Sequence, residues 1–170
     1  MQLTARPADA DDIPALAQLL SEASMAVATE RGGLDFLARE GVAPPLEDQL
    51  ELWLADPATY LVVGTAEGVT LAMALCRLET LRDGERLARL EFLWVDAGVR
   101  QIGLGAELME LVVDWAQDNG AGSLDAFALP GNRDAKNFLE SAGFSARLLV
   151  MNRRLGDGPG RSRRPRPPQS

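Results

Sequence analysis

The stretch from Arg89 to Trp115 restricts the folds open to this chain more than any other part of its sequence. An apolar run, Leu90 to Val95, leads through a short segment into Arg100-Gln101-Ile102-Gly103-Leu104-Gly105, and a helical pattern begins at once. Glycines at 103 and 105 remove side chains where the backbone must turn tightly and approach another group closely. The first turn of a helix has amides without acceptors and carries partial positive charge. The stretch therefore predicts a strand, a glycine turn and a helix N-terminus that suit a pyrophosphate, with Arg100 as an additional cation.

Two glycines in this position also have a simpler explanation, because they allow a helix to pack closely on a sheet. The stretch differs from the dinucleotide-binding fingerprint, since only Gly103 and Gly105 fit it and the preceding strands form a meander. It is not a Walker loop, because the sequence contains no Gly-Lys-Ser/Thr. Further motifs are therefore needed to choose between packing and binding.

The chain contains no histidine and a single cysteine, Cys76. This composition excludes a Ser-His-Asp triad, a Cys-His pair and a histidine-based zinc site, and we predict no metal. Acid–base chemistry must come from carboxylates, Tyr60, Lys136, Cys76, chain termini or water. Cys76 lies in an apolar run and is predicted to pack in the core. A lone cysteine cannot form an intrachain disulfide, so the expected compartment is the cytoplasm.

The net charge of −8 is unevenly distributed. Residues 156–170 carry +3 through four arginines and one aspartate, which leaves −11 on the rest. We predict one domain over residues 1–155 and a disordered Pro/Arg-rich tail over 156–170. The acidic body is expected to avoid nucleic acid and to favour cationic partners such as amines. No apolar window is long enough for a membrane span, so no membrane partner is expected.

Hydrophobic periodicity and turn residues predict a mixed α/β (α+β) fold, with a mostly antiparallel sheet. Asp12 is expected to cap the first helix, and Gly143 to end the last one. The predicted strands span 2–6, 60–66, 69–78, 89–95, 123–129 and 144–155, with helices beginning at 12, 46, 104 and 135 and a short one near 34–39.

Two motifs together resemble the GNAT family of N-acetyltransferases. The first is Arg100-x-x-Gly103-x-Gly105, at the end of the expected fourth strand. The second is Asn132-x-x-Ala135-x-x-Phe138-Leu139-x-x-x-Gly143-Phe144, one helix and one strand further on. The match covers residues 63–155 clearly and the N-terminal third only in element order. The resemblance implies a sheet of about six to seven strands flanked by about four helices.

The resemblance also implies that acetyl-CoA is the acyl donor and that specific residues bind it. The implied cofactor-binding residues are Leu93, Trp94, Val95, Arg100, Gln101, Ile102, Gly103, Leu104, Gly105, Ala106, Asn132, Lys136 and Phe138. Backbone groups of 93–95 would pair with the pantetheine arm, and amides of 101–106 would cradle the pyrophosphate. A neutral amine would then attack the thioester directly.

Glu91 is the predicted catalytic residue, because it is a carboxylate inside an otherwise apolar strand. It is expected to share a strand face with Leu93 and Val95 and to receive the proton of the amine. The alternative is a structural ion pair with Arg77 or Arg89. The usual tyrosine donor of the family is absent, since Leu139 stands at that position, and the only tyrosine, Tyr60, begins another strand.

The hypothesis from the sequence is therefore an acetyl-CoA-dependent N-acetyltransferase that acts on a primary amine. The acceptor remains open among small-molecule and peptide or protein amines, and transfer of a different acyl group is a further option. The alternative hypothesis is a non-catalytic module that binds coenzyme A as a sensor or scaffold. A homodimer through the final strand or the meander is also considered.

Overall fold

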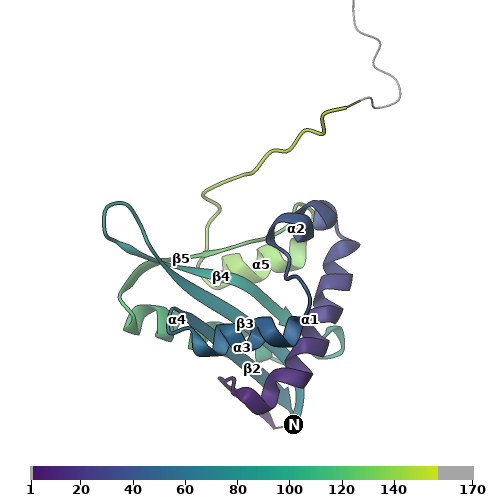
Figure 1. Cartoon of the computed structure of the whole chain (residues 1–170), viewed down its shortest axis with the longest axis vertical. Coiled ribbons are helices and arrows are strands. Elements are labelled where there is room, and N and C mark those ends of the chain that lie inside the picture. The colour runs from purple at the N-terminus through teal and green to yellow at the C-terminus, as the bar shows by residue number, and fades with distance from the viewer. Residues whose placement is uncertain (1, 157–170) are drawn as a thin grey trace, which may run out of the picture.

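The computed structural model describes residues 2–156, and Figure 1 shows the arrangement of their helices and strands. The elements in chain order are β1 (Leu3–Pro7), α1 (Ile13–Ala28), α2 (Gly33–Glu40), α3 (Leu46–Ala55), β2 (Thr59–Ala66), β3 (Val69–Thr80), β4 (Arg86–Val95), α4 (Leu104–Asp118), β5 (Ala121–Ala126) and α5 (Arg133–Ser141). Short 3-10 turns precede α1, at Ala10–Asp12, and follow β4, at Ala97–Val99.

The five strands form one sheet in the order β1-β2-β3-β4-β5. All neighbours are antiparallel except β4 and β5, which are parallel because α4 crosses between them. The predicted meander of three strands is confirmed by β2, β3 and β4. The strands β1 and β5 are the two edges of this sheet.

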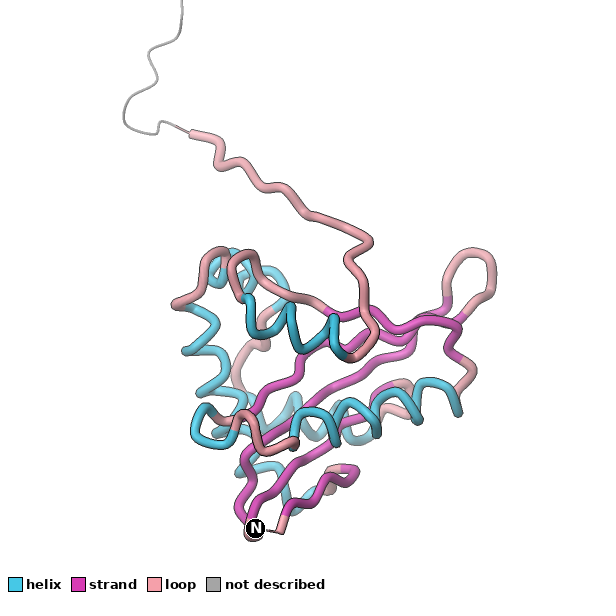
Figure 2. Tube along the Cα trace, turned by 180° about the vertical axis from the view of Figure 1, so that it is seen from behind, coloured by secondary structure: helices cyan, strands magenta, loops and turns pink. Residues whose placement is uncertain are grey.

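Helices cover both faces of the sheet. On one face, α1 and α3 bury Leu16, Leu50 and Trp53 against Met73 and Leu75 of β3. On the other face, α4 crosses the sheet and buries Leu104, Leu108 and Val112 against small residues of β2 and β3. Figure 2 shows this second face, with α4 and α5 in front of the strands. Each face thus has its own apolar core.

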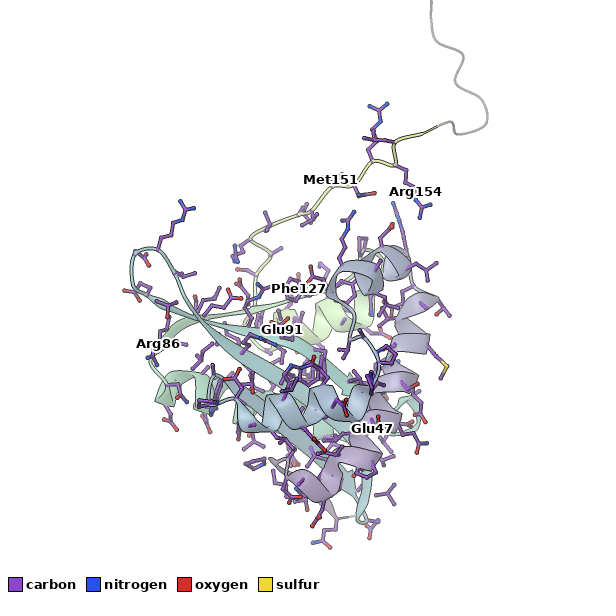
Figure 3. All side chains as sticks on the ribbon, viewed as in Figure 1. Glu47, Arg86, Glu91, Phe127, Met151 and Arg154 are labelled. Atoms are coloured by element: carbon purple, nitrogen blue, oxygen red, sulfur yellow. The ribbon has the colours of Figure 1, made fainter. Side chains whose placement is uncertain are left out.

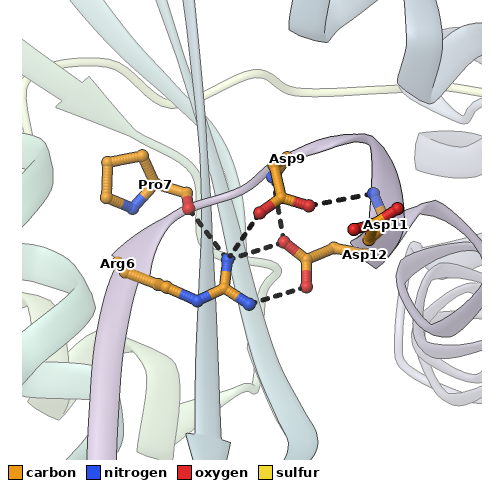
Figure 4. A network of polar contacts seen from close by, with 5 residues as sticks. All are labelled: Arg6, Pro7, Asp9, Asp11 and Asp12. Carbon is orange, nitrogen blue, oxygen red and sulfur yellow. Dashed lines mark hydrogen bonds and ion pairs between the residues drawn. The ribbon is translucent and has the colours of Figure 1, made fainter.

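The start of α1 differs from the prediction. Asp12 makes no side-chain cap for α1; Asp9 caps the preceding turn instead, and Asp12 completes that capping box from its third position. The Asp12 carboxylate accepts hydrogen bonds from Arg6 at 2.7 and 2.9 Å and from the Asp9 amide at 2.9 Å (Figure 4). The guanidinium of Arg6 lowers the pKa of Asp12, which is nearly buried.

The predicted final strand over residues 144–155 is wrong. The chain is helical to Ser141 and turns at Gly143, which has a φ of +91° as predicted for the residue ending the helix. Beyond it, residues 144–155 form no strand and extend away from the sheet, as Figures 1 and 2 show. Phe144 still packs on the core, and Arg147 and Arg154 pair with Asp125 and Asp35. The sheet therefore has five strands, where six to seven were predicted. The described residues form five α-helices, where about four were predicted. An apolar run specifies a strand only where a partner is in reach, and here the run lies in solvent.

The predicted tail lies outside the described residues from position 157 onward. Within residues 2–156, no helix combines the length and the apolar character needed to cross a membrane.

Candidate active site

A β-bulge in β4 shapes the centre of the sheet. The register pairs Leu75 with Phe92 but Cys76 with Leu90, so Glu91 is an extra residue on β4. In a regular strand, residues two apart share a face. Here Leu90 packs on the α4 side and Phe92 on the α1–α3 side, because the bulge interrupts the alternation.

The strands β4 and β5 separate immediately after this bulge. Their parallel pairing ends at Leu90 opposite Ala126, so residues 91–95 of β4 have no strand partner on the β5 side. Backbone N–H and C=O groups along this edge are available to an extended ligand. The separation opens a cleft of about 1060 Å³ between β4, the loop before α4, and α5.

The loop that enters α4 supplies the positive end of a helix to this cleft. Gly103 is the N-cap of α4 in the left-handed conformation, with φ +95°, and no side chain caps the helix. A Cβ at Gly103 would meet no atom within 4 Å, so the space in front of the turn is open. Gln101 also has a positive φ, +92°, which strains a residue with a side chain. Such an uncapped, open helix N-terminus is suited to an anion.

Arg100 folds back over the end of β4. Its Nε donates to the carbonyl oxygen of Val95 at 3.2 Å, and its guanidinium lies 5.1 Å from the ring centroid of Trp94. The indole Nε1 of Trp94 is buried and has no hydrogen-bond partner among the described residues. A permanent cation therefore lies at the junction of the free strand edge and the helix N-terminus.

Asn132 connects two walls of the cleft. Its Oδ1 accepts from the amide of Ala135 and so caps α5, while its Nδ2 donates to both carboxylate oxygens of Glu30, at 3.0 and 3.1 Å. Glu30 lies in the turn between α1 and α2. This contact ties the segment between the first two helices to the start of α5 across the cleft.

Glu91 lines the cleft and is ion-paired. Its Oε1 lies 3.6 Å from Nε of Arg77. By alternation, Arg77 shares a strand face with Met73 and Leu75, on the α1–α3 side of the sheet. The expected common face for Glu91, Leu93 and Val95 is therefore wrong, because the bulge turns Glu91 toward Arg77. Phe127, which follows β5, lies at the same end of the cleft (Figure 3).

The structure brings most of the predicted site residues together around the cleft. Those that line it are Glu91, Leu93, Trp94, Val95, Arg100, Gln101, Gly103, Gly105, Ala106, Asn132 and Phe138. Three others do not line it. The side chain of Leu104 is buried in the core, Ile102 packs against that same core, and Lys136 pairs with Glu140 on the exposed face of α5 at 2.8 Å.

Several lining residues were missed by sequence reasoning. They include Glu30, Arg31, Phe127, Pro130 and Arg133. Phe127 packs against Phe36 of α2, with ring centroids 6.4 Å apart, and beneath the guanidinium of Arg89 at 5.0 Å. No spacing in the sequence indicates these contacts, because they join segments that lie far apart in the chain.

Cys76 and Tyr60 lie outside the cleft. Cys76 is fully buried, as predicted, and burial raises the pKa of its thiol to about 12. The ring of Tyr60 stacks on Trp115 of α4 at 5.1 Å, and burial raises the pKa of its hydroxyl. Neither residue lines the cleft.

The model of the acetyltransferase (GNAT) family matches residues 24–144, which is well over half of the chain. This chain belongs to the GNAT acetyltransferase family. The matched region runs from α1 to the turn after α5 and contains the bulge, the glycine turn and Asn132. A search for similar sequences among curated proteins finds no match.

Several solved structures share the fold of this chain at low sequence identity. A tetramutant of the BH1408 protein from Bacillus halodurans has a TM-score of 0.76 and 20% identity, and the alignment covers 89% of this chain and 99% of that one. Ribosomal-protein-alanine N-acetyltransferase from Brucella melitensis has a TM-score of 0.68 at 17% identity, with 91% and 100% covered. Glucosamine-6-phosphate N-acetyltransferase from Arabidopsis thaliana has a TM-score of 0.68 at 18% identity, with 92% and 100% covered.

Proposed function

We propose that this GNAT protein transfers the acetyl group of acetyl-CoA to a primary amine by direct attack. The observation that carries the proposal is the junction, in one cleft, of an unpaired strand edge and an open helix N-terminus. The first suits the extended, amide-containing pantetheine arm, and the second suits the pyrophosphate. Neither feature alone distinguishes a ligand site from packing.

The residues of the cleft divide between these tasks. Backbone groups of Leu93 to Val95 hold the arm in the manner of an added strand. The amides of the turn from Gln101 to Ala106 hold the phosphates, and Arg100 moves from Val95 to neutralise them. Phe138 of α5 flanks the ligand on the opposite side.

The thioester supplies an activated acyl carbon. Two proton transfers accompany the attack: the amine loses a proton, and the leaving thiolate gains one. Glu91 receives the proton of the attacking amine, directly or through water. Within the described residues, no tyrosine, cysteine or lysine lines the cleft, so no side chain of those types protonates the leaving thiolate. The thiolate of a thiol with a pKa of about 8.5 leaves without such help, and water then protonates it.

The proposed acceptor is a primary amine of a small molecule or of a peptide or protein. The names of the structural neighbours include both kinds of acceptor. Leu139, which lines the cleft where the family resemblance implies tyrosine, favours one rival: a module that binds coenzyme A without turnover.

Thermal unfolding with acetyl-CoA, coenzyme A and NADH tests the donor. A ligand at about one hundred times its dissociation constant stabilises a fold by about 2.7 kcal/mol. For a domain of this size we expect the midpoint to rise on the order of 5 to 12 °C with acetyl-CoA and not with NADH. An equal response to NADH, or none to either, contradicts the proposed donor.

Glu91→Gln tests the catalytic step, with Glu79→Gln as a matched control. Both carboxylates are ion-paired to arginines on the sheet, but only Glu91 lines the cleft. With a panel of primary amines, we expect Glu91→Gln to lower kcat by about 10²-fold while the acetyl-CoA midpoint shift persists. Glu79→Gln should leave both unchanged. Turnover by neither wild type nor variant, with the shift intact, would favour the non-catalytic module.

A further inference from the structure

The free edge of β4 divides the cleft into two halves that lie on opposite faces of the sheet. Leu93 and Val95 pack toward α4, as does Phe138 of α5. Phe92 and Trp94 pack toward α1 and α3. The helix N-terminus that suits the phosphates belongs to α4, so the donor occupies the first half and the amine has to approach from the second. We call the second the acceptor half; it is lined by Glu30, Arg31, Glu91, Phe92, Trp94 and Phe127.

Phe127 belongs to the acceptor half because its neighbours lie on that face of the sheet. Arg89 is paired in register with Arg77, and directly opposite residues share a face, here the face of α1 and α3. The guanidinium of Arg89 lies 5.0 Å from the centroid of the Phe127 ring. Glu91, which is ion-paired with Arg77, lies on the same face (Figure 3). The ring and the carboxylate therefore line the same half of the cleft.

Aromatic side chains are concentrated around this half. The chain has five phenylalanines, three tryptophans and one tyrosine, and three of these residues, Phe92, Trp94 and Phe127, line the acceptor half. Two more lie behind them: Trp53 contacts Phe92 with ring centroids 5.8 Å apart, and Phe36 contacts Phe127 at 6.4 Å. Phe127 is 44% exposed and belongs to neither core. Such a wall suits a ligand that has an aromatic ring of its own.

The charges of the acceptor half suit one ammonium group and disfavour a second. Glu91 and Glu30 are its two carboxylates, and both oxygens of Glu30 accept hydrogen bonds from Asn132. Arg31 lines the same half and has no ion pair within residues 2–156. A ligand with further ammonium groups would place them near Arg31 or Arg77, where like charges repel. The acceptor half therefore differs from the acidic body as a whole, which favours cations in general.

Two contacts close the acceptor half at the end near α2. Glu30, in the turn between α1 and α2, is bound to Asn132 at the start of α5, and Phe36 of α2 packs on Phe127. Figures 1 and 2 both show α2 beside α5 at this end. An extended polypeptide would have to separate these contacts, whereas a small molecule would not.

We infer that the acceptor is a small monoamine with an aromatic ring, which packs against Phe92 and Phe127 while the amine lies next to Glu91. This inference rests on the proposed acetyl transfer. The amine nitrogen forms a bond to the acyl carbon as the C–S bond breaks, and the proton that the nitrogen loses is balanced by the one that the thiolate gains. The products are the N-acetylated amine and the free thiol of coenzyme A.

Release of the coenzyme A thiol with three primary amines tests the substrate class. 2-Phenylethylamine is the aromatic monoamine, n-butylamine lacks the ring, and spermidine carries additional ammonium groups. We expect kcat/KM for 2-phenylethylamine to exceed that for n-butylamine by about 10- to 100-fold, because burial of a phenyl ring is worth a factor of that order. Spermidine should be no better than n-butylamine. If spermidine is the best substrate, or if the ring brings no gain, the inference is overturned while the proposed acetyl transfer stands.

Phe127→Ala tests the aromatic wall, with Leu81→Ala as a matched control. Leu81, in the turn between β3 and β4, is 40% exposed and does not line the cleft. Phe127→Ala should lower kcat/KM for 2-phenylethylamine by about tenfold and that for n-butylamine by much less, while the acetyl-CoA midpoint shift persists. Leu81→Ala should change none of these values. Equal losses with both amines in Phe127→Ala would contradict recognition of the ring.

Thermal unfolding in saturating coenzyme A separates a failure of this inference from a failure of the proposed function, because it needs no turnover. We expect 2-phenylethylamine to raise the midpoint further in the wild type, and Phe127→Ala to lose most of that rise at the same amine concentration. A rise without turnover of any amine would support the aromatic amine site and contradict the acetyl transfer. Neither a rise nor turnover would overturn both.

Discussion

Gly103 and Gly105 occupy one motif but have different structural reasons to be glycine. Gly103 has a φ of +95° with open space around it, whereas a Cβ at Gly105 would meet Val95 at 3.4 Å and Phe138 at 3.6 Å, both ordinary contacts. The first position demands a backbone conformation that side chains disfavour. The second demands only a small residue on the floor of the cleft.

Replacing Gly103 and Gly105 by alanine in separate variants distinguishes the requirement for a left-handed backbone from the requirement for a small side chain. Gly103→Ala should lower the free energy of unfolding by about 1 to 2 kcal/mol, because alanine resists the left-handed conformation. It should also weaken acetyl-CoA binding, because the turn must shift. Gly105→Ala should change stability by less than about 0.5 kcal/mol. Urea unfolding and thermal shifts with acetyl-CoA measure both; equal losses in the two variants would contradict the distinction.

At the scale of elements, the position of α4 depends on a glycine in a different strand. A Cβ on Gly64 of β2 would lie 2.9 Å from Leu104 and 3.0 Å from Ala72, and both of these residues are fully buried. Leu104 is the first residue of α4 and follows the glycine turn directly. The packing of β2 against α4 therefore fixes where the helix N-terminus points.

Gly64→Ala should displace the start of α4. We expect a loss of about 1 to 3 kcal/mol in the free energy of unfolding, as for other overpacked cores. Acetyl-CoA affinity should fall as well, although Gly64 does not line the cleft. Leu104→Ala in the same protein should restore part of the affinity by making room. Unchanged affinity in Gly64→Ala would show that the turn keeps its place independently of this packing.

For the whole molecule, stability in acid depends on carboxylates that arginines hold ionised. The pKa of Asp12 is lowered chiefly by its hydrogen bonds from Arg6, and that of Asp125 chiefly by its hydrogen bond from Arg147. A carboxyl whose pKa is lower in the folded state stabilises the fold above its unfolded pKa, 3.8 here. That contribution disappears as pH falls through the lower, folded value.

Arg6→Gln should therefore destabilise the protein at neutral pH and progressively less below pH 3.8. We expect a loss of about 1 kcal/mol at pH 7, because water screens the partly exposed arginine. Arg147→Gln is the comparison, and its effect should be smaller because its side chain is 64% exposed. Urea unfolding across pH measures both; a constant Arg6→Gln deficit down to pH 2 would exclude ionisation of Asp12 as its cause.

Local patterns in the sequence were sufficient to predict the helices, the three-stranded meander and the glycine turn. Each depends on neighbours within a few residues: alternation for the strands, 3.6-residue spacing for the helices, and a left-handed conformation for Gly103 and Gly143. The resemblance carried by Arg100, Gly103, Gly105 and Asn132 led to the family for the same reason, because these residues serve local turns and caps.

The orientation of Glu91, the contact between Glu30 and Asn132, and the conformation of residues 144–155 depend on contacts between distant segments. Only the register of β3 with β4 reveals the bulge that turns Glu91 toward Arg77, and only the folded chain brings Glu30 within reach of Asn132, 102 residues away. The segment over 144–155 shows the same limit, because its apolar pattern predicts a strand, and no strand forms there in the folded chain. Pairing partners are a property of the tertiary structure, since the free energy of a strand lies in what covers it.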